Sequence, residues 1–395
     1  MSATSTWQSC GAMHLTGDPD GPPLVIPWPV ADRADSLGKR FALDAGVLAE
    51  RAATTGLARQ GRASCGGATR LVRARDEWIA LSLPREDDVV LLTALLGIEA
   101  FDREQVWTAI AAEVAHHPAV ELHERAELLD VAFSIVGAHS GPFAACGHPR
   151  EGATPPHSPL VVDLSALWAG PLCTHMIQRA GARVIKVEDP ARPDGARAGS
   201  AAFFDLLNED KQSVALDFAS PCGRALLVDL LDAADVIVTS SRARAFEQIG
   251  ILPGEVLRSG SDKVWTAITA YGWSSNRVGF GDDVAAGVGL VALHPVDGEP
   301  RFASDAVADP LCGLEAAELT LDCLARGGRW FVDASLAGAA SKVAVSASPS
   351  RAAELRDGHW EIDGTAVQAP RARSASGSAR PLGADTEAVL TDMLH

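Results

Sequence analysis

The stretch from residue 160 to residue 188, LVVDLSALWAGPLCTHMIQRAGARVIKVE, decides the fold. It holds two short runs rich in β-branched residues, 160–165 and 183–188, on either side of a segment with helical spacing, in which Pro171 stands where a first helical residue would be. Further runs of the strand type follow at 213–218, 235–240 and 264–269. Strand and helix alternate, which is typical of a parallel sheet, and we predict a Rossmann-like α/β fold.

The Pro-rich segment REGATPPHSPL at residues 150–160 favours extended chain and opposes helix, so we place a domain boundary there. Upstream, alanine-rich helical stretches surround one predicted hairpin, TRLVRARDEWIALSL (69–83), with its turn at Arg75-Asp76. The chain is thus predicted to hold a separate small α+β domain at 1–150, the Rossmann-like large domain at 158–345, and at 346–395 a tail that packs back on the large domain and ends in a short helix.

Composition limits the partners that we expect. The 51 acidic residues outnumber the 34 basic ones, and the net charge of −17 disfavours nucleic acid and anionic bilayers, although a local basic cluster could still hold a small anion. No run approaches the about 18 consecutive apolar residues of a membrane span. The seven cysteines include no CxxC pair, and the first residues lack a signal-peptide pattern, so we expect reduced thiols and a cytoplasmic protein.

The turn after the first predicted strand lacks the glycines of a dinucleotide site. DLSALWAGP (163–171) has one glycine followed by proline, and GxGxxG, GxxxxGK[ST], HExxH and GxSxG motifs are missing from the chain. The histidines do not cluster as metal ligands apart from His116-His117, a pair that fits an exposed helix surface better. We therefore predict no dinucleotide, P-loop nucleotide or metal site.

Asp309 is the most informative candidate for chemistry. Pro310 follows it, and an apolar-periodic helix then runs to Gly327-Gly328. This pattern predicts an N-cap with proline at the first helical position, which by itself requires no catalysis. The same position would lower the pKa of the carboxyl group and keep it ionised as a nucleophile. The local sequence alone favours the plain cap.

One segment of the chain echoes another. Residues 11–32, GAMHLTGDPDGPPLVIPWPVAD, resemble residues 287–309, GVGLVALHPVDGEPRFASDAVAD, with DG in the middle and VAD at the end. We interpret the echo as a duplicated segment, and chance similarity between loops rich in glycine and proline is the alternative. Asp32 of the first copy would correspond to Asp309 of the second.

Together these runs resemble a known family. The resemblance is carried by VVDLSALWAGPLCTHMIQRAGARVIKVEDPARPDGAR (161–197), VADPLCGLEAA (307–317) and WFVDASLAGA (330–339). They are similar, in order, to family III CoA-transferases, also called CaiB/BaiF, a group that includes formyl-CoA and carnitine CoA-transferases and α-methylacyl-CoA racemase. The family's small domain would follow WFVDASL, where this chain has little room for it, so we expect it to be placed N-terminally here.

The resemblance implies a role for Asp309, which stands four residues before Gly313 as the family's aspartate nucleophile does. That aspartate attacks an acyl-CoA thioester, exchanges the acyl group for CoA through an anhydride, and passes CoA to a second carboxylate. The family context favours catalysis over a plain cap. It implies an acyl-CoA and a carboxylic acid as partners, CoA as a substrate with no further cofactor or metal, and a homodimer.

Further site residues are implied by the same resemblance. The expected CoA contacts are Leu167, Trp168, Ala169, Leu216, Ser240, Ser241 and Thr269. The expected glycine loop over the reacting aspartate is Cys65, Gly66 and Gly67. Ordinary packing and a turn before a hairpin are the respective alternatives. The family's phosphate contacts are not reproduced, and possible substitutes, each of which also fits a solvated face, are Arg192, Arg242, Arg244 and Lys211.

Two other functions stay open. The racemase branch uses a histidine in a GHD motif, where this chain has Gly281-Asp282-Asp283, and the loss of the imidazole disfavours α-proton exchange unless another residue supplies the base. A non-catalytic acyl-CoA-binding homologue would fit the missing phosphate contacts and the displaced small domain.

Overall fold

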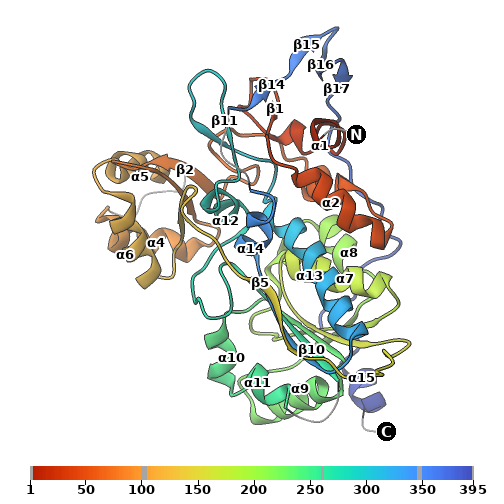
Figure 1. Cartoon of the computed structure of the whole chain (residues 1–395). Helices are drawn as coiled ribbons and strands as arrows, with labels where there is room; N and C mark the ends of the chain where they lie inside the picture. Colours follow the sequence, from red (N-terminus) through yellow and green to blue (C-terminus); the bar gives the residue numbers. More distant parts are fainter. Residues whose placement is uncertain (1–2, 99–104, 259–261, 345–348, 394–395) are drawn as a thin grey trace.

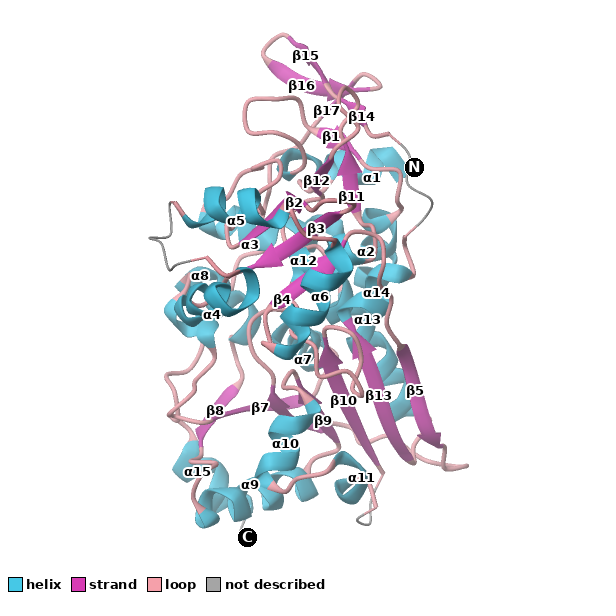
Figure 2. Cartoon of the chain, turned by 90° about the vertical axis from the view of Figure 1, so that its left-hand side faces the viewer, coloured by secondary structure: helices cyan, strands magenta, loops and turns pink. Residues whose placement is uncertain are grey.

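The computed structural model describes residues 3–98, 105–258, 262–344 and 349–393, and a seven-stranded sheet lies in the lower half of the view in Figure 2. The strand order is β5-β13-β10-β9-β6-β7-β8, and every neighbouring pair is parallel except β5 with β13. The strands are β5 (Phe143–His148), β6 (Leu160–Leu164), β7 (Arg183–Glu188), β8 (Gln212–Ala215), β9 (Val236–Thr239), β10 (Lys263–Thr269) and β13 (Arg329–Ser335). The predicted α/β fold with a Rossmann-like sheet is confirmed.

All five predicted runs are strands. β7 has the predicted bounds, whereas β8 ends at Ala215, three residues before the prediction did. The chain turns there, since Asp217 accepts hydrogen bonds from the backbone of Ala219 and Ser220, and α9 begins at Pro221 with Ser220 as its N-cap, as predicted. The pattern did not identify β13 or the antiparallel β5.

Helices cover both faces of the sheet (Figure 1). Adjacent strand residues point to opposite faces, so Val161 lies in the core beneath α7 and α13, and Val162 lies in the core beneath α9, α10 and α15. The helices around the sheet are α7 (Ala169–Arg179), α8 (Ala201–Asn208), α9 (Pro221–Ala233), α10 (Ala243–Ile249), α11 (Pro253–Val256), α13 (Ala308–Ala325), α14 (Leu336–Ser341), α15 (Thr386–Met393) and the 3-10 helix η4 (Gly195–Ala198).

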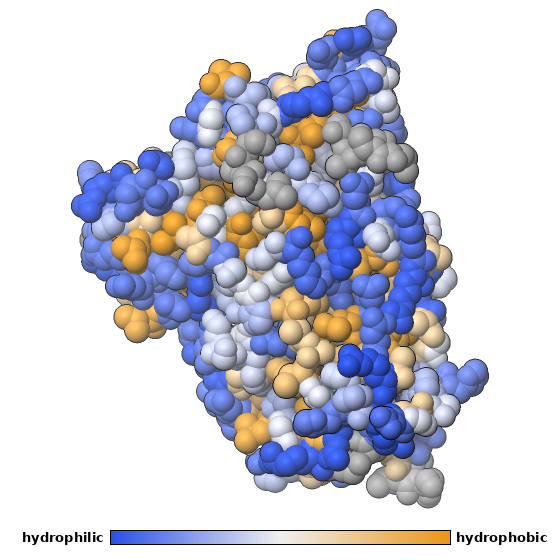
Figure 3. Space-filling view, viewed as in Figure 1, coloured by the Kyte–Doolittle hydropathy of each residue, from blue (hydrophilic) through white to orange (hydrophobic). Residues whose placement is uncertain are grey.

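A separate lobe stands to one side of the sheet (Figure 1). It has a hydrophobic core of its own, formed within residues 72–133, and its outer surface is mostly hydrophilic in the view of Figure 3. The predicted hairpin is confirmed, and its turn is closed by a hydrogen bond from Ala74 N–H to Glu77 O at 2.9 Å. The lobe consists of β2 (Thr69–Arg73), β3 (Trp78–Ser82), α4 (Glu86–Leu96), α5 (Val106–Val114), α6 (Ala119–Leu128) and β4 (Ala132–Ile135).

The N-terminal residues belong to the large core rather than to the lobe. Trp7, Met13 and Leu48 are buried in one cluster with Leu311 of α13 and Val332 of β13. The region expected as one small domain, 1–150, is thus divided in space, and its last strand, β5, completes the large sheet beside β13. Its first elements are α1 (Ala3–Ser9), η1 (Met13–Leu15), β1 (Leu24–Val25), α2 (Val30–Gly38), η2 (Lys39–Phe41), η3 (Ala45–Ala49) and α3 (Glu50–Thr55).

Short antiparallel pairs complete the chain. β1 pairs with β14, β11 with β12, and β15 to β17 form a small sheet that projects from the end near the N-terminus (Figure 1). The expected final helix is α15, whose Val389 packs beneath the sheet. The remaining elements are β11 (Val291–Leu293), β12 (Pro300–Phe302), β14 (Arg351–Ala352), β15 (Glu354–Arg356), β16 (His359–Ile362), β17 (Thr365–Ala366) and α12 (Gly281–Gly287). Across the described ranges, none of the helices is both long and apolar enough to cross a membrane.

The two copies of the echoed segment both lead into a helix. α2 begins at Val30 and α13 at Ala308, so the shared VAD stands at a helix start each time, and Arg33 of α2 donates to Glu315 of α13 at 2.9 Å. The middles differ, because β1 pairs with β14 whereas β11 and β12 pair with each other. Duplication remains an interpretation.

Candidate active site

Asp309 lies on the path from β12 into α13. The helix begins at Ala308, and Val307 before it has helical backbone angles and no capping side chain. The prediction that Asp309 is the N-cap and Pro310 the first helical residue is therefore wrong, because Asp309 is already the second helical residue. Its N–H donates to Ala306 O at 2.9 Å, and the residue as a whole is partly exposed.

Two further aspartates stand beside Asp309. Asp305 lies on the turn before α13 and is fully buried, and Asp282, the second residue of α12, is buried as well. The Asp282 carboxylate accepts a hydrogen bond from Ala306 N–H at 2.8 Å, which joins α12 to this turn. Gly281 packs directly against the Asp309 carboxylate. Three carboxyl groups therefore converge at the start of α13, and we call them the aspartate cluster.

Arg51 on α3 brings positive charge to the aspartate cluster. Its guanidinium donates to both carboxylate oxygens of Asp305, from Nε at 2.8 Å and from Nη2 at 2.5 Å. The same guanidinium lies over the ring of Trp168, 5.3 Å from the ring centroid. A bidentate pair of this kind fixes geometry as well as charge. Arg51 is thus held from two sides at the edge of the cluster.

The surroundings set the protonation of the cluster. Burial raises the pKa of Asp309 to about 7, with Arg51 acting to lower it and Asp282 and Asp305 acting to raise it. Burial and Asp305 also raise the pKa of Asp282, to about 6. The expectation that the helix start would lower the pKa of Asp309 is wrong, because desolvation and like charges outweigh the helix dipole here. Asp309 therefore changes charge near neutral pH.

Asp283 connects the cluster's helix to the lobe. It is fully buried, and its Oδ1 accepts hydrogen bonds from Ser82 Oγ of β3 at 2.9 Å and from Phe280 N at 2.8 Å. Ser82 Oγ also lies 2.7 Å from Thr69 Oγ1 of β2. Burial raises the pKa of Asp283 to about 7. This buried network fixes the lobe's sheet against α12.

The structure brings the predicted glycine loop to the cluster. The Cys65 thiol lies 3.6 Å from Ser304 O and 3.7 Å from Leu15 O, and burial raises its pKa well above the usual range, with Asp305 and Asp282 adding to the shift. A Cβ on Gly66 would lie 3.7 Å from Nη2 of Arg51. Gly67 has a φ of 78° and open space around it. Cys65 and Gly66 therefore lie over the Arg51 side of the site.

Two of the expected CoA contacts lie next to the start of α13. Trp168 is buried beneath Arg51, and the carbonyl oxygen of Ala169 packs against Gly313, where a Cβ would come within 2.7 Å of it. Leu167, with a φ of 69°, is 45% exposed, and its N–H donates to Asp194 Oδ1 at 3.0 Å. The loop after β6 thus runs from solvent to the cluster.

The other expected contacts follow neighbouring strands. Ser240 comes directly after β9, and its Oγ accepts a hydrogen bond from Ala166 N–H at 2.9 Å, while the neighbouring Ser241 is exposed. Thr269 ends β10, and its Oγ1 accepts from Gly272 N–H at 2.9 Å. Leu216 follows β8 at the far edge of the sheet, where its side chain is buried in the core under α9. The structure does not bring Leu216 to the aspartate cluster.

The four basic residues considered as substitutes for the family's phosphate contacts have different surroundings. Lys211 is fully buried and donates to Asp163 Oδ2 at 3.0 Å, so the expectation that it could contact a phosphate is wrong. Arg242 and Arg244 both donate to the carboxylate of Asp130, which follows α6 of the lobe. Arg192 is exposed.

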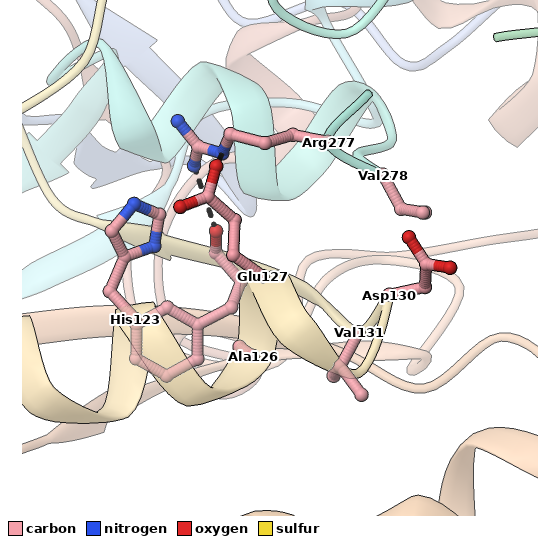
Figure 4. Close-up of a pocket in the computed structure, with 8 residues that line it drawn as sticks. His123, Ala126, Glu127, Asp130, Val131, Arg277 and Val278 are labelled. Carbon is pink, nitrogen blue, oxygen red and sulfur yellow. Dashed lines mark hydrogen bonds and ion pairs between the residues drawn. The ribbon is translucent and has the colours of Figure 1, made fainter. Parts of the chain in front are cut away.

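A small pocket marks the junction between the lobe and the loop after β10 (Figure 4). Arg277 reaches across it toward the lobe, where its Nε lies 3.8 Å from Glu127 Oε1 of α6 and its Nη2 donates to Phe133 O of β4 at 3.2 Å. His123 and Asp130 also line it. With the Asp130 pairs, these contacts hold the lobe next to the carboxyl ends of β9 and β10.

Sequence reasoning missed Arg51, Asp305 and the clustering of Asp282 with Asp309. Arg51 and Asp305 are 254 residues apart in the chain, and no local pattern marks either of them. The unusual pair Asp282-Asp283 was visible as a replacement for a histidine motif, but not as part of a cluster. Within the ranges described above, no group of three or more His, Cys, Asp or Glu side chains is arranged to hold a metal ion.

Comparison with known proteins places this site in context. The model of CoA-transferase family III matches residues 159–358, which contain Asp309 and most of the sheet. An acyl-CoA transferase of Fusarium pseudograminearum is 32% identical over 202 residues, which cover 45% of this chain and 44% of that protein. A succinate–glutarate CoA-transferase of Agrobacterium fabrum is 32% identical over 172 residues, 39% of this chain and 43% of that protein. The chain thus spans less than half the length of these relatives.

Among solved structures, a CaiB/BaiF family protein from Brucella suis aligns with a TM-score of 0.45 and 26% sequence identity. The alignment covers 52% of this chain and 62% of that one.

Proposed function

Because the chain belongs to CoA-transferase family III, we propose that it moves CoA from an acyl-CoA to a free carboxylic acid, with Asp309 as the nucleophile. The observation that carries the proposal is Asp309, a partly exposed residue at the start of α13, inside the region that the family model matches, with Arg51, Asp282 and Asp305 acting on its carboxyl group. A carboxylate whose pKa is about 7 is ionised in a large fraction of molecules at neutral pH, as a nucleophile must be.

The proposed reaction has two mirrored halves. The Asp309 carboxylate attacks the thioester carbonyl, the CoA thiolate leaves, and an acyl-aspartyl anhydride forms. The thiolate then attacks the aspartyl carbonyl, which releases the first acid as a carboxylate and leaves an aspartyl-CoA thioester. The acceptor carboxylate attacks that thioester and expels the thiolate, which attacks the acceptor's acyl carbonyl and regenerates Asp309. Each bond that breaks is replaced by one that forms, and no redox step occurs.

The surrounding residues have proposed roles in this reaction. The ends of β6, β9 and β10, with Leu167, Ser240, Ser241 and Thr269, would contact CoA, since open α/β sheets bind ligands at the carboxyl ends of their strands. Trp168 and Ala169 would position the thioester near Asp309, and Cys65 to Gly67 would cover it. The proposal includes a homodimer in the cytoplasm, with CoA as a substrate and no further cofactor. Leu216 is left out because its side chain is buried in the sheet's core.

The direct test is to trap CoA on the protein. We would incubate it with a panel of acyl-CoAs, reduce with borohydride or cleave with hydroxylamine, and analyse peptides by mass spectrometry. The proposal expects the label on Asp309 and none in Asp309→Ala. Asp32→Asn, the corresponding position on α2, is the matched control and should be labelled like wild type. A label on Asp32 would show that the two copies had been assigned the wrong way round, and turnover by folded Asp309→Ala would overturn the mechanism.

An isomerase of the racemase type is the second candidate. Burial raises the pKa of Asp283 to about 7, a value suited to proton exchange. However, Asp283 is fully buried and accepts a hydrogen bond from Ser82, and for this reason we favour CoA transfer over isomerisation. Deuterium incorporation at the α-carbon of a 2-methylacyl-CoA, without CoA transfer, would identify the isomerase. Binding of acyl-CoA with neither reaction would identify a non-catalytic homologue.

A further inference from the structure

Arg51 joins three parts of the site through one guanidinium group. Its Nε and Nη2 donate to the Asp305 carboxylate, its face lies over Trp168, and the glycine loop passes beside Nη2 at Gly66. Asp305 in turn lies on the turn that carries Asp309 into α13. The position of Arg51 therefore depends on three parts of the site: the segment of Trp168, the glycine loop, and the turn that leads to Asp309.

We infer that Arg51 is the positioning residue of this site: held by Asp305 and Trp168, its guanidinium supplies the positive charge that keeps Asp309 ionised among its acidic neighbours. The inference rests on the proposed function, because it concerns the same carboxylate. Arg51 comes from the N-terminal segment, outside the residues that the family model matches. The site is therefore assembled from two distant parts of the chain.

The ionisable groups with the largest effects on the Asp309 carboxyl group come from several elements. Arg51 comes from α3, Asp282 from α12, Asp305 from the turn, and the buried Cys312 thiol from α13 itself. The Cys65 thiol of the glycine loop faces Asp305, Asp282 and Arg51. Arg51 is the cation among these groups. Its loss therefore leaves only acidic groups, each of which disfavours a negative charge on Asp309. An opposite charge at short range shifts a carboxyl pKa by about 1 to 3 units.

The contact geometry makes arginine the suitable residue. A planar fork can hold both oxygens of Asp305 while its face lies on an indole ring, whereas a lysine ammonium offers one charge and no fork. The pair is also well shielded, since Asp305 is fully buried. Arg51→Lys should therefore preserve most of the electrostatic effect and lose the alignment of Trp168 and Gly66.

The test measures the ionisation of Asp309 without any substrate. Full-length protein labelled with [4-¹³C]aspartate is titrated by NMR from pH 4 to pH 9, and the Asp309 resonance is assigned by its absence in Asp309→Asn. We expect the Asp309 midpoint to rise by about one unit or more in Arg51→Gln and by less in Arg51→Lys. An unchanged midpoint in a folded Arg51→Gln protein would overturn the inference.

The matched control is Arg40→Gln. Arg40 also joins the N-terminal segment to α13, with Nη1 2.6 Å from Asp322 Oδ1, but 13 residues further along the helix, about 20 Å from Asp309. This variant removes an ion pair of the same kind and should leave the midpoint unchanged. A shift equal to that of Arg51→Gln would show that the effect is structural and would overturn the inference.

A second comparison applies if Arg51→Gln does not fold. This comparison uses Asp305→Asn and the double variant Arg51→Gln/Asp305→Asn, which differ only in the guanidinium group. The double variant leaves no unpaired buried charge from this ion pair. We expect the higher Asp309 midpoint in the double variant, and equal midpoints would overturn the inference. Failure of the proposed function has a different signature: wild type would transfer no CoA in the acyl-CoA panel while the midpoints still moved.

Discussion

Gly281 lies so close to Asp309 that a methyl group on Gly281 would come within 2.1 Å of Asp309 Oδ2. The same methyl group would lie 2.6 Å from the backbone oxygen of Ala306, so it could not be accommodated by a small shift of one flexible side chain. The absence of a side chain at residue 281 is therefore a condition for the position of the Asp309 carboxylate, the nucleophile that we propose.

We accordingly expect Gly281→Ala to displace the Asp309 carboxylate. CoA transfer should fall by at least two orders of magnitude, since small misplacements of reacting groups have effects of about 100-fold, and stability should fall by about 1 to 3 kcal/mol. Steady-state kinetics and thermal unfolding measure the two effects. Gly377→Ala, at a position with open space around it, is the control and should retain both properties. Wild-type activity in Gly281→Ala would show that Asp309 is not held by this contact.

The pH dependence of transfer should follow the aspartate cluster. Asp309 must be ionised to attack and its pKa is about 7, so kcat/KM should fall about tenfold per unit below that pH and level off above it. Asp282, with a pKa of about 6, is close enough to titrate together with Asp309. The midpoint of the acidic limb of the pH–rate profile therefore describes the aspartate cluster rather than Asp309 alone. A profile that stays flat down to pH 5 would contradict this assignment. Rate measurements with a pH-insensitive acyl-CoA substrate provide the check.

The buried Asp283 should make stability depend on pH. Its pKa is about 7 in the folded state and near 3.9 when unfolded, so the folded state binds the extra proton between these values. Stability is therefore highest below the unfolded pKa and falls as pH rises toward 7, by about 1.4 kcal/mol per unit. Asp283→Asn should reduce this slope and keep the acceptor for Ser82. Equal slopes in urea unfolding of variant and wild type would contradict the prediction.

The C-terminal part of the chain should not fold alone. Trp7, Met13 and Leu48 occupy the same core as Leu311 and Val332, so a fragment that begins at Pro156 would expose that surface to water. We expect it to be insoluble or to lack a cooperative thermal transition. Addition of residues 1–155 as a second chain should recover soluble protein. A cooperative transition in the fragment alone would show that the N-terminal segment is an independent attachment.

Local patterns and distant contacts differ in how well the sequence predicts them. β7 was predicted with its observed bounds because its β-branched residues Val184, Ile185 and Val187 stand close together, and the hairpin of β2 and β3 because its turn stands between two short runs of strand-forming residues. The start of α13 was misplaced because no cap marks it, and the sign of the Asp309 pKa shift was missed because it depends on burial and on the carboxyl groups of Asp282 and Asp305, whose proximity only the fold reveals. Only the fold brings Arg51 to Asp305.

The antiparallel strand β5 constrains the order in which the protein can fold. It precedes the rest of the sheet in the chain, yet its partner is β13, the last strand of the sheet to leave the ribosome. The apolar side chains between Trp7 and Leu48 likewise find their partners on α13 and β13. The segment of α1 to α3 therefore cannot bury these side chains until α13 and β13 have been synthesised, and through that interval its apolar surface stays open to the contacts that chaperones prevent.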